Sequence, residues 1–193
     1  MINKLFALLF LLIFVSFTFG QNRRTKEIRE INSYVKSVST YIDKSSKKLK
    51  IYADVSKTEK PKWRKFDSEK TFEKFRENVE VYTIAYVWRK RNKIVEANFT
   101  FSSGSGDWAH YVFYSFREDG TIAKIKAELR TFYGHIIVIR NLYFDRNGNQ
   151  IKKTIQYRDL ETGKPKTPND DFIDEKINIY KTTKKLPFIK LLK

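Results

Sequence analysis

The chain has 193 residues, with 39 Lys or Arg against 22 Asp or Glu, so its net charge is +17 and its pI is about 9.9. A hydrophobic content of 41% indicates a packed core and excludes a disordered chain, while only seven glycines exclude a collagen-like one. Because cysteine is absent, the composition also excludes a disulfide framework, thiolate metal sites and a cysteine nucleophile.

Residues 1–20 have the pattern of a secretory signal peptide. Lys4 gives a positive start, Leu5–Val15 is an unbroken apolar run, and smaller or more polar residues follow up to Gly20. The run is shorter than the roughly 20 residues that a membrane-spanning helix needs. We therefore expect cleavage near Gly20 and Gln21 and a secreted or periplasmic mature protein, with an uncleaved N-terminal anchor as the alternative.

From Thr25 to about Lys47, apolar residues recur at steps of three and four, the period of an amphipathic helix. Asn22 or Thr25 would cap its start, and core packing is favoured over a coiled coil because the repeat is only two to three heptads long. The repeating apolar positions of the helix are Ile28, Ile31, Val35, Val38 and Ile42.

Further on, Leu49–Val55 predicts a strand and Ser56–Lys65 a polar link.

The next segments predict a short second helix over Ser68–Asn78, capped by Ser68, and then a series of strands. Tight links with Asp-Gly or Asn-Gly turns join the strands, which is typical of an antiparallel meander. The six predicted strands are Val79–Arg89, Ile94–Ser102, Trp108–Arg117, Thr121–Phe132, Ile136–Phe144 and Ile151–Arg158.

Thr121–Phe132 alternates: Lys124, Lys126, Glu128 and Arg130 lie on the same side as Ile122, and Ala123, Ile125, Ala127 and Leu129 lie on the other. We expect an α+β fold in which the long N-terminal amphipathic helix packs on a curled antiparallel meander of about six strands. The element order is similar to that of cystatin-like and nuclear-transport-factor-like folds. Residues 21–175 would form one domain.

Residues 176–193 predict a basic C-terminal tail with six lysines and no acidic residue. Its apolar residues would allow peripheral contact with an anionic bilayer, with the lysines at the headgroups. These apolar residues are Phe188, Ile189, Leu191 and Leu192.

The only two histidines, His110 and His135, begin strands at the same edge of the meander, so they could approach each other. Asp107 lies three residues before His110, a spacing that puts the two on opposite faces of a strand. Carboxylate partners at metal-ligand spacing are not evident. The sequence therefore assigns no catalytic residue, no metal ligand and no cofactor.

Positive charge is the main functional feature. Residues 21–65 contain fourteen Lys or Arg and five Asp or Glu, and a second basic cluster marks a hairpin tip at residues 89–93. Tryptophans beside cations suit an anionic or sugar ligand. The candidate ligand-binding residues are Trp63, Arg64, Trp88, Arg89, Lys90, Arg91, Trp108 and His110.

Export would bring this basic surface to polyanions outside the cytoplasm rather than to nucleic acid. We expect a non-enzymatic binding module for an anionic ligand, such as an acidic polysaccharide, a lipid headgroup or an acidic protein. One alternative is a small hydrolase or isomerase whose pocket in the concave sheet pairs a histidine with Asp107 or Glu128. Another is a structural protein that pairs through a sheet edge.

Overall fold

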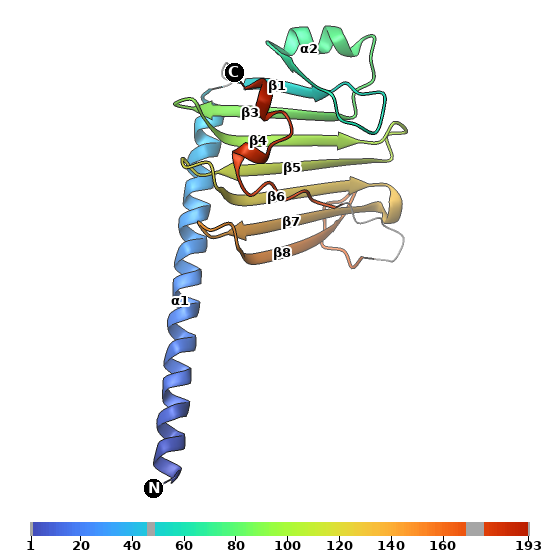
Figure 1. Ribbon diagram of the computed structural model, residues 1–193. Helices are drawn as coiled ribbons and strands as arrows, with labels where there is room; N and C mark the ends of the chain where they lie inside the picture. Colours follow the sequence, from blue (N-terminus) through green and yellow to red (C-terminus); the bar gives the residue numbers. More distant parts are fainter. Residues whose placement is uncertain (1, 46–48, 169–175, 193) are drawn as a thin grey trace.

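The computed structural model describes residues 2–45, 49–168 and 176–192, with side chains from residue 23 onward. An antiparallel sheet of eight strands, in the order β2-β1-β3-β4-β5-β6-β7-β8, forms the body of the molecule (Figure 1). Helix α1 (Ile2–Asp43) runs along one end of the strands and continues beyond the sheet, and α2 (Glu69–Arg76) lies near the β1–β2 edge. The predicted α+β class is confirmed.

The sheet has eight strands rather than about six. The six predicted meander strands and the predicted strand at residues 49–55 are all present, but β2 lies in the segment predicted as a polar link. Two of its four residues are exposed and basic, so its sequence carries little strand pattern. The strands are β1 (Leu49–Asp54), β2 (Trp63–Phe66), β3 (Thr83–Lys90), β4 (Lys93–Ser102), β5 (Trp108–Phe116), β6 (Ile122–Thr131), β7 (Ile136–Phe144) and β8 (Gln150–Asp159).

The C-terminal segment 176–192 packs over one face of the sheet, which we call the covered face. Leu186 and Phe188 are buried there, and the Phe188 ring stacks on Tyr52 with ring centres 4.4 Å apart. The amide of Ile122 donates to the carbonyl of Lys181 at 2.9 Å, which ties the segment to the start of β6. The covered face includes Ala97, Phe99, Val112, Tyr114, Ile125, Ala127 and Leu142.

This packing corrects two expectations. The main apolar face is covered by the C-terminal segment and not by the N-terminal helix, because Leu186 and Phe188 fill its centre. Phe188 has no exposed surface, so this fold does not offer its side chain to a bilayer. Residues 177–180 form no strand.

Helix α1 instead packs on the opposite side of the sheet, near the strand ends. Its Ile31 contacts Ala123 and Tyr143, and the Tyr34 hydroxyl donates to the carbonyl of Phe116 at 2.5 Å. The helix runs unbroken from Ile2, so the expected start and cap at residues 22–25 are wrong. Residues 21–26 include no glycine or proline that would interrupt it.

The helix ends at Asp43, earlier than the predicted end at Lys47. Lys44 follows the last turn, whereas Lys47 lies outside the described residues. The second helix is confirmed with its predicted cap: the Ser68 hydroxyl accepts from the Thr71 amide, and Thr71 returns the bond in a capping box.

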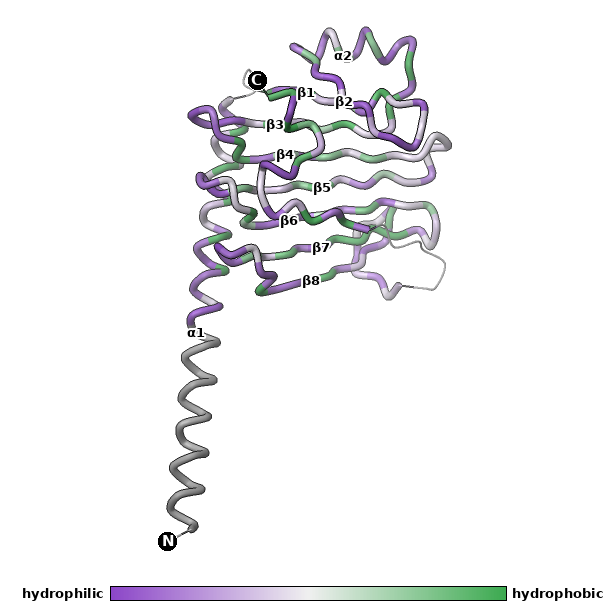
Figure 2. The backbone as a smooth tube through the Cα atoms, viewed as in Figure 1, coloured by the Kyte–Doolittle hydropathy of each residue, from purple (hydrophilic) through white to green (hydrophobic). Residues whose placement is uncertain are grey.

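Hydropathy alternates along the strands (Figure 2). The register shifts at Trp88/Arg89, Ser115/Phe116 and Tyr143/Phe144, which the sequence does not reveal. A β-bulge at Phe116 lets Ile122 join the covered face and turns Ala123 toward α1, the reverse of the predicted sides. From Lys124 onward the predicted alternation is confirmed.

Among the residues that the structure describes, no helix is both long and apolar enough to cross a membrane.

Replacing Phe188 by alanine should lower the free energy of unfolding by about 3–5 kcal/mol, because a fully buried ring leaves a cavity over the sheet. Urea denaturation of the wild type and of Phe188→Ala measures this change. Lys190→Ala, at an exposed position of the same segment, should change stability by no more than about 0.5 kcal/mol. A loss below about 1 kcal/mol for Phe188→Ala would mean that the segment does not close the core.

Candidate functional site

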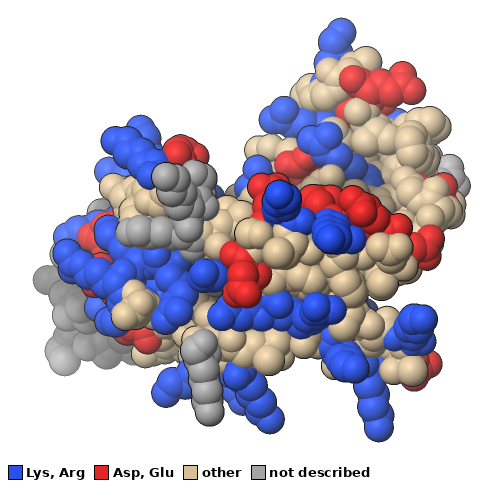
Figure 3. Space-filling view, turned by 90° about the horizontal axis from the view of Figure 1, so that it is seen from above, with Lys and Arg blue, Asp and Glu red and all other residues tan. Residues whose placement is uncertain are grey.

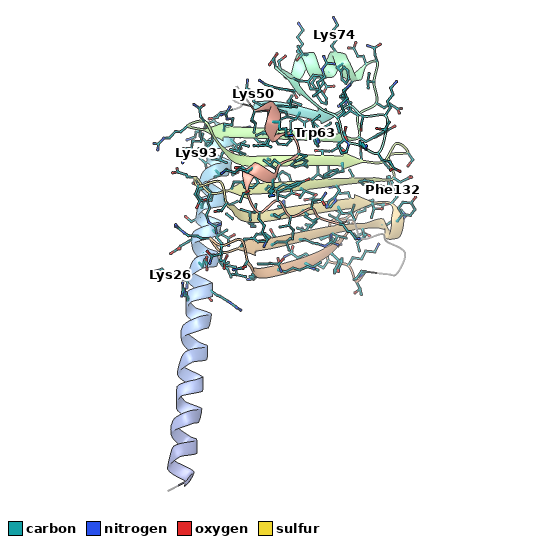
Figure 4. All side chains as sticks on the ribbon, viewed as in Figure 1. Lys26, Lys50, Trp63, Lys74, Lys93 and Phe132 are labelled. Atoms are coloured by element: carbon teal, nitrogen blue, oxygen red, sulfur yellow. The ribbon has the colours of Figure 1, made fainter. Side chains whose placement is uncertain are left out.

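Six cations gather where the end of α1, the start of β1 and the β3–β4 turn meet, and we call this cluster the basic end. In the space-filling view Lys and Arg dominate this side of the molecule (Figure 3). Lys50 and Lys93 lie near one another on the same side (Figure 4). Pairing of β1 with β3 places Lys50 opposite Val87, two residues before Arg89. The basic end comprises Lys44, Lys50, Arg89, Lys90, Arg91 and Lys93.

The β3–β4 turn presents these cations on a fixed backbone. Lys90 and Lys93 pair across the hairpin, and the two residues between them, Arg91 and Asn92, have φ angles of 49° and 63°. Such left-handed pairs form the tight turn that favours Asn, Asp or Gly at its centre. Asn92 suits the turn, but Arg91 occupies a conformation that an arginine rarely adopts. The arginine side chain is therefore presented outward at some cost to the backbone.

Two contacts hold the turn in place. The Arg89 guanidinium donates to the carbonyl of Asn92 through Nη2 at 2.8 Å and Nε at 3.2 Å. From α1, the Tyr41 hydroxyl donates to the carbonyl of Arg89 at 2.7 Å, and Lys90 Nζ lies 5.5 Å from the centre of the Tyr41 ring. The helix and the hairpin thus keep the cations of the basic end close together despite their like charge.

The charges of the basic end are not neutralised by nearby carboxylates. Within residues 23–45, 49–168 and 176–192, none of the six cations forms an ion pair with an acidic side chain. The carboxyl of Glu96, which pairs with Trp88 across the sheet, is buried, and burial raises its pKa to about 7. Near neutral pH the Glu96 carboxyl is partly protonated, so its negative charge offsets the positive charge of the basic end only in part.

A hollow of about 370 Å³ lies between this hairpin and the β5–β6 turn. Arg89 and Lys93 line one side, but Glu118 and Asp119 line the other. The hydroxyl and amide of Thr121 bond to Asp119 and lower the pKa of that carboxyl, which stays ionised. An anion is therefore better placed on the outer tip of the hairpin than inside the hollow.

The structure brings together four of the eight predicted ligand-binding residues. Trp88, Arg89, Lys90 and Arg91 are consecutive at the end of β3 and in its turn. Sequence reasoning did not add Tyr41 to this group. Tyr41 widens the apolar stripe of α1, but nothing in the sequence places Tyr41 at the β3–β4 hairpin.

Trp63 and Arg64 lie elsewhere, on β2. The Trp63 ring packs edge-on against Phe99 and Phe188, at 5.9 and 5.5 Å between ring centres, so it belongs to the core. Arg64 points to the opposite face, where its guanidinium carbon lies 4.8 Å from the centre of the Phe75 ring. Neither residue joins the basic end.

Trp108 and His110 line a small cavity of about 200 Å³ on the covered face, beside Lys176–Asn178. His110 is 3% exposed, and burial, followed by the charge of Arg140, lowers its pKa to about 4. It is therefore neutral near pH 7.

The expected histidine–carboxylate pair does not form among the described residues. Glu128 lies on the other side of the sheet from His110, and Asp107 bonds to the hydroxyl of Ser105. His135 lies just before β7, at the same end of the sheet as His110, as predicted, but β6 separates β5 from β7. No group of three His, Asp or Glu in the described part of the chain could hold a metal ion.

Comparisons with family models, with curated proteins and with solved structures found no match to this chain.

The raised pKa of Glu96 has a consequence for stability. Its carboxyl holds a proton in the folded chain up to about pH 7, whereas the unfolded chain releases it near pH 4.5. The stabilisation is complete below pH 4.5 and is lost as the pH rises through 7, by up to about 1.4 kcal/mol per pH unit. Wild type should therefore lose stability relative to Glu96→Gln across this window, measured by urea unfolding. A difference that does not change with pH would contradict the assigned burial.

Proposed function

We propose that the protein is an exported, non-enzymatic binding module whose basic end holds an anionic ligand. The observation that carries this proposal is the cluster of six cations, free of ion pairs within the described residues, on a hairpin tied to α1. Holding like charges together without direct ion pairs is unfavourable, and an anionic ligand relieves that repulsion.

The unusual turn supports the same proposal. An asparagine at position 91 would suit the left-handed backbone better than arginine does, so the turn carries this arginine against local preference. Strained positions of this kind are often found where a side chain has a binding role.

The two alternatives have less support. A hydrolase or isomerase would need His110 or His135 beside a carboxylate, and the described residues provide no such pair for His110. Pairing through the β8 edge is disfavoured by Lys152 and Lys153, exposed cations of the type that protects sheet edges.

A polyphosphate column tests the proposal with two variants of equal charge. The first carries Lys90→Gln, Arg91→Asn and Lys93→Gln, and Arg91→Asn is expected to relieve the turn rather than to destabilise it. The second carries Lys57→Gln, Lys60→Gln and Lys62→Gln in the exposed β1–β2 loop. Wild type should bind at low salt and elute as ionic strength passes about 0.1 M, where exposed charges are screened within about 10 Å.

The basic-end variant should lose most of this retention, and the loop variant should keep most of it. Equal loss in both variants would show that net charge alone acts, without a site. Absence of retention at low salt, or retention that salt does not change, would reject the proposal.

A further inference from the structure

The face of the sheet opposite the C-terminal segment, which we call the open face, carries regular rows of polar and aromatic side chains. Strand register aligns each row across five strands, from β4 to β8. One row consists of Asn98, Phe113, Lys126, Asn141 and Thr154. The next row consists of Thr100, Tyr111, Glu128, Ile139 and Gln156.

These two rows lie outside the contacts that α1 makes. The helix packs one row nearer the strand ends, over Tyr143 and Ala123. Phe113 and Tyr111 are half-buried, Lys126 is exposed, and none of the hydrophobic clusters of the described chain includes either ring. These two rows therefore face solvent over β4 to β8, while α2 packs on the part of the open face over β1 to β3.

The cations of the open face outnumber its acids. Glu128 lies between Lys126 and Arg130 on β6, at 3.7 and 2.7 Å from their nitrogens, so one carboxylate is shared by two cations. Arg158 is exposed at the end of the next row. Lys126 also lies over the Phe113 ring, with its Nζ 5.6 Å from the ring centre. This leaves a net positive face that includes aromatic rings.

Its uncharged polar groups are amides and hydroxyls, which both donate and accept hydrogen bonds. The Asn141 amide donates to the Thr154 hydroxyl at 3.4 Å, a long bond that is easily exchanged. Such groups match a ligand rich in hydroxyls, and aromatic rings match the apolar faces of sugar rings.

We infer that the open face binds a linear acidic polysaccharide, with sugar rings over Phe113 and Tyr111 and carboxylates near Lys126 and Arg130. This inference rests on the proposed function and names its ligand class. The nitrogens of Lys126 and Arg130 both reach the Glu128 carboxylate. Arg158 lies in the same row as Arg130 two strands away, about 10 Å, so Arg130 and Arg158 would meet charges spaced along a polymer rather than one compact anion. The exchangeable pair of Asn141 and Thr154 favours hydroxyl-rich sugars over phosphate chains.

Four probes test the inference: polygalacturonate, polyphosphate, neutral dextran and oligothymidylate, with affinities measured at low salt and at about 0.5 M NaCl, where surface charge attraction is screened. Polygalacturonate should remain bound at high salt, whereas polyphosphate should be released. Tyr111→Thr with Phe113→Thr should weaken high-salt binding of polygalacturonate about tenfold, because two ring contacts are lost. The matched control is Phe132→Thr with Tyr133→Thr, at rings that are 60% and 47% exposed in the β6–β7 turn.

The inference is overturned if polyphosphate binds as well as polygalacturonate at high salt, or if the control pair weakens binding as much as the open-face pair. Equal binding of dextran would remove the acidic requirement, and tighter binding of oligothymidylate would assign the face to nucleic acid instead. Failure of the proposed function looks different: neither polyanion binds at low salt. Circular dichroism of each variant confirms that the strands remain formed.

Discussion

The fold depends on the burial of one face of a single-layer sheet. An eight-stranded antiparallel sheet has two faces, and the aromatic one cannot remain in water without a large hydrophobic penalty. The chain covers it with its last seventeen described residues, of which Leu186 and Phe188 are the anchors. The Phe188 ring contacts the rings of three strands, from Tyr52, Trp63 and Phe99, so it joins the β1–β2 edge to the centre of the sheet.

Because the C-terminal segment covers that face, the opposite face need not be buried over its whole area. Antiparallel sheets tolerate one solvated face, and over β4 to β8 its middle rows carry amides, hydroxyls and paired charges among aromatic rings, while α2 covers the part over β1 to β3. Helix α1 occupies only the strand ends, where Tyr34 and Tyr41 bond to strand carbonyls. That placement leaves the middle rows exposed, and the bond from Tyr41 holds in place the β3–β4 hairpin that carries the basic end. The two surfaces of functional interest thus follow from where the two ends of the chain pack.

Local patterns were sufficient for much of this structure. The period of the helix, the Ser68 cap and the Asp-Gly and Asn-Gly turns each act through neighbouring residues, so they could be predicted from sequence. The cover over the sheet could not, because Phe188 meets Tyr52 across more than a hundred residues of chain. The bulge at Phe116 reversed the sides of Ile122 and Ala123, which alternation alone does not reveal. In the candidate site, the basic hairpin was visible in the sequence, but its attachment to Tyr41 was not.

Because the chain has no native cysteine, single introduced thiols can compare the two faces directly. Ile125 and Lys126 are neighbours on β6 and point to opposite sides, so Ile125→Cys and Lys126→Cys form a matched pair. With a small thiol reagent, Lys126→Cys should react at the rate of an unfolded peptide, and Ile125→Cys roughly a hundredfold or more slowly, since it must wait for local opening. Similar rates at the two positions would contradict the account of one covered and one open face.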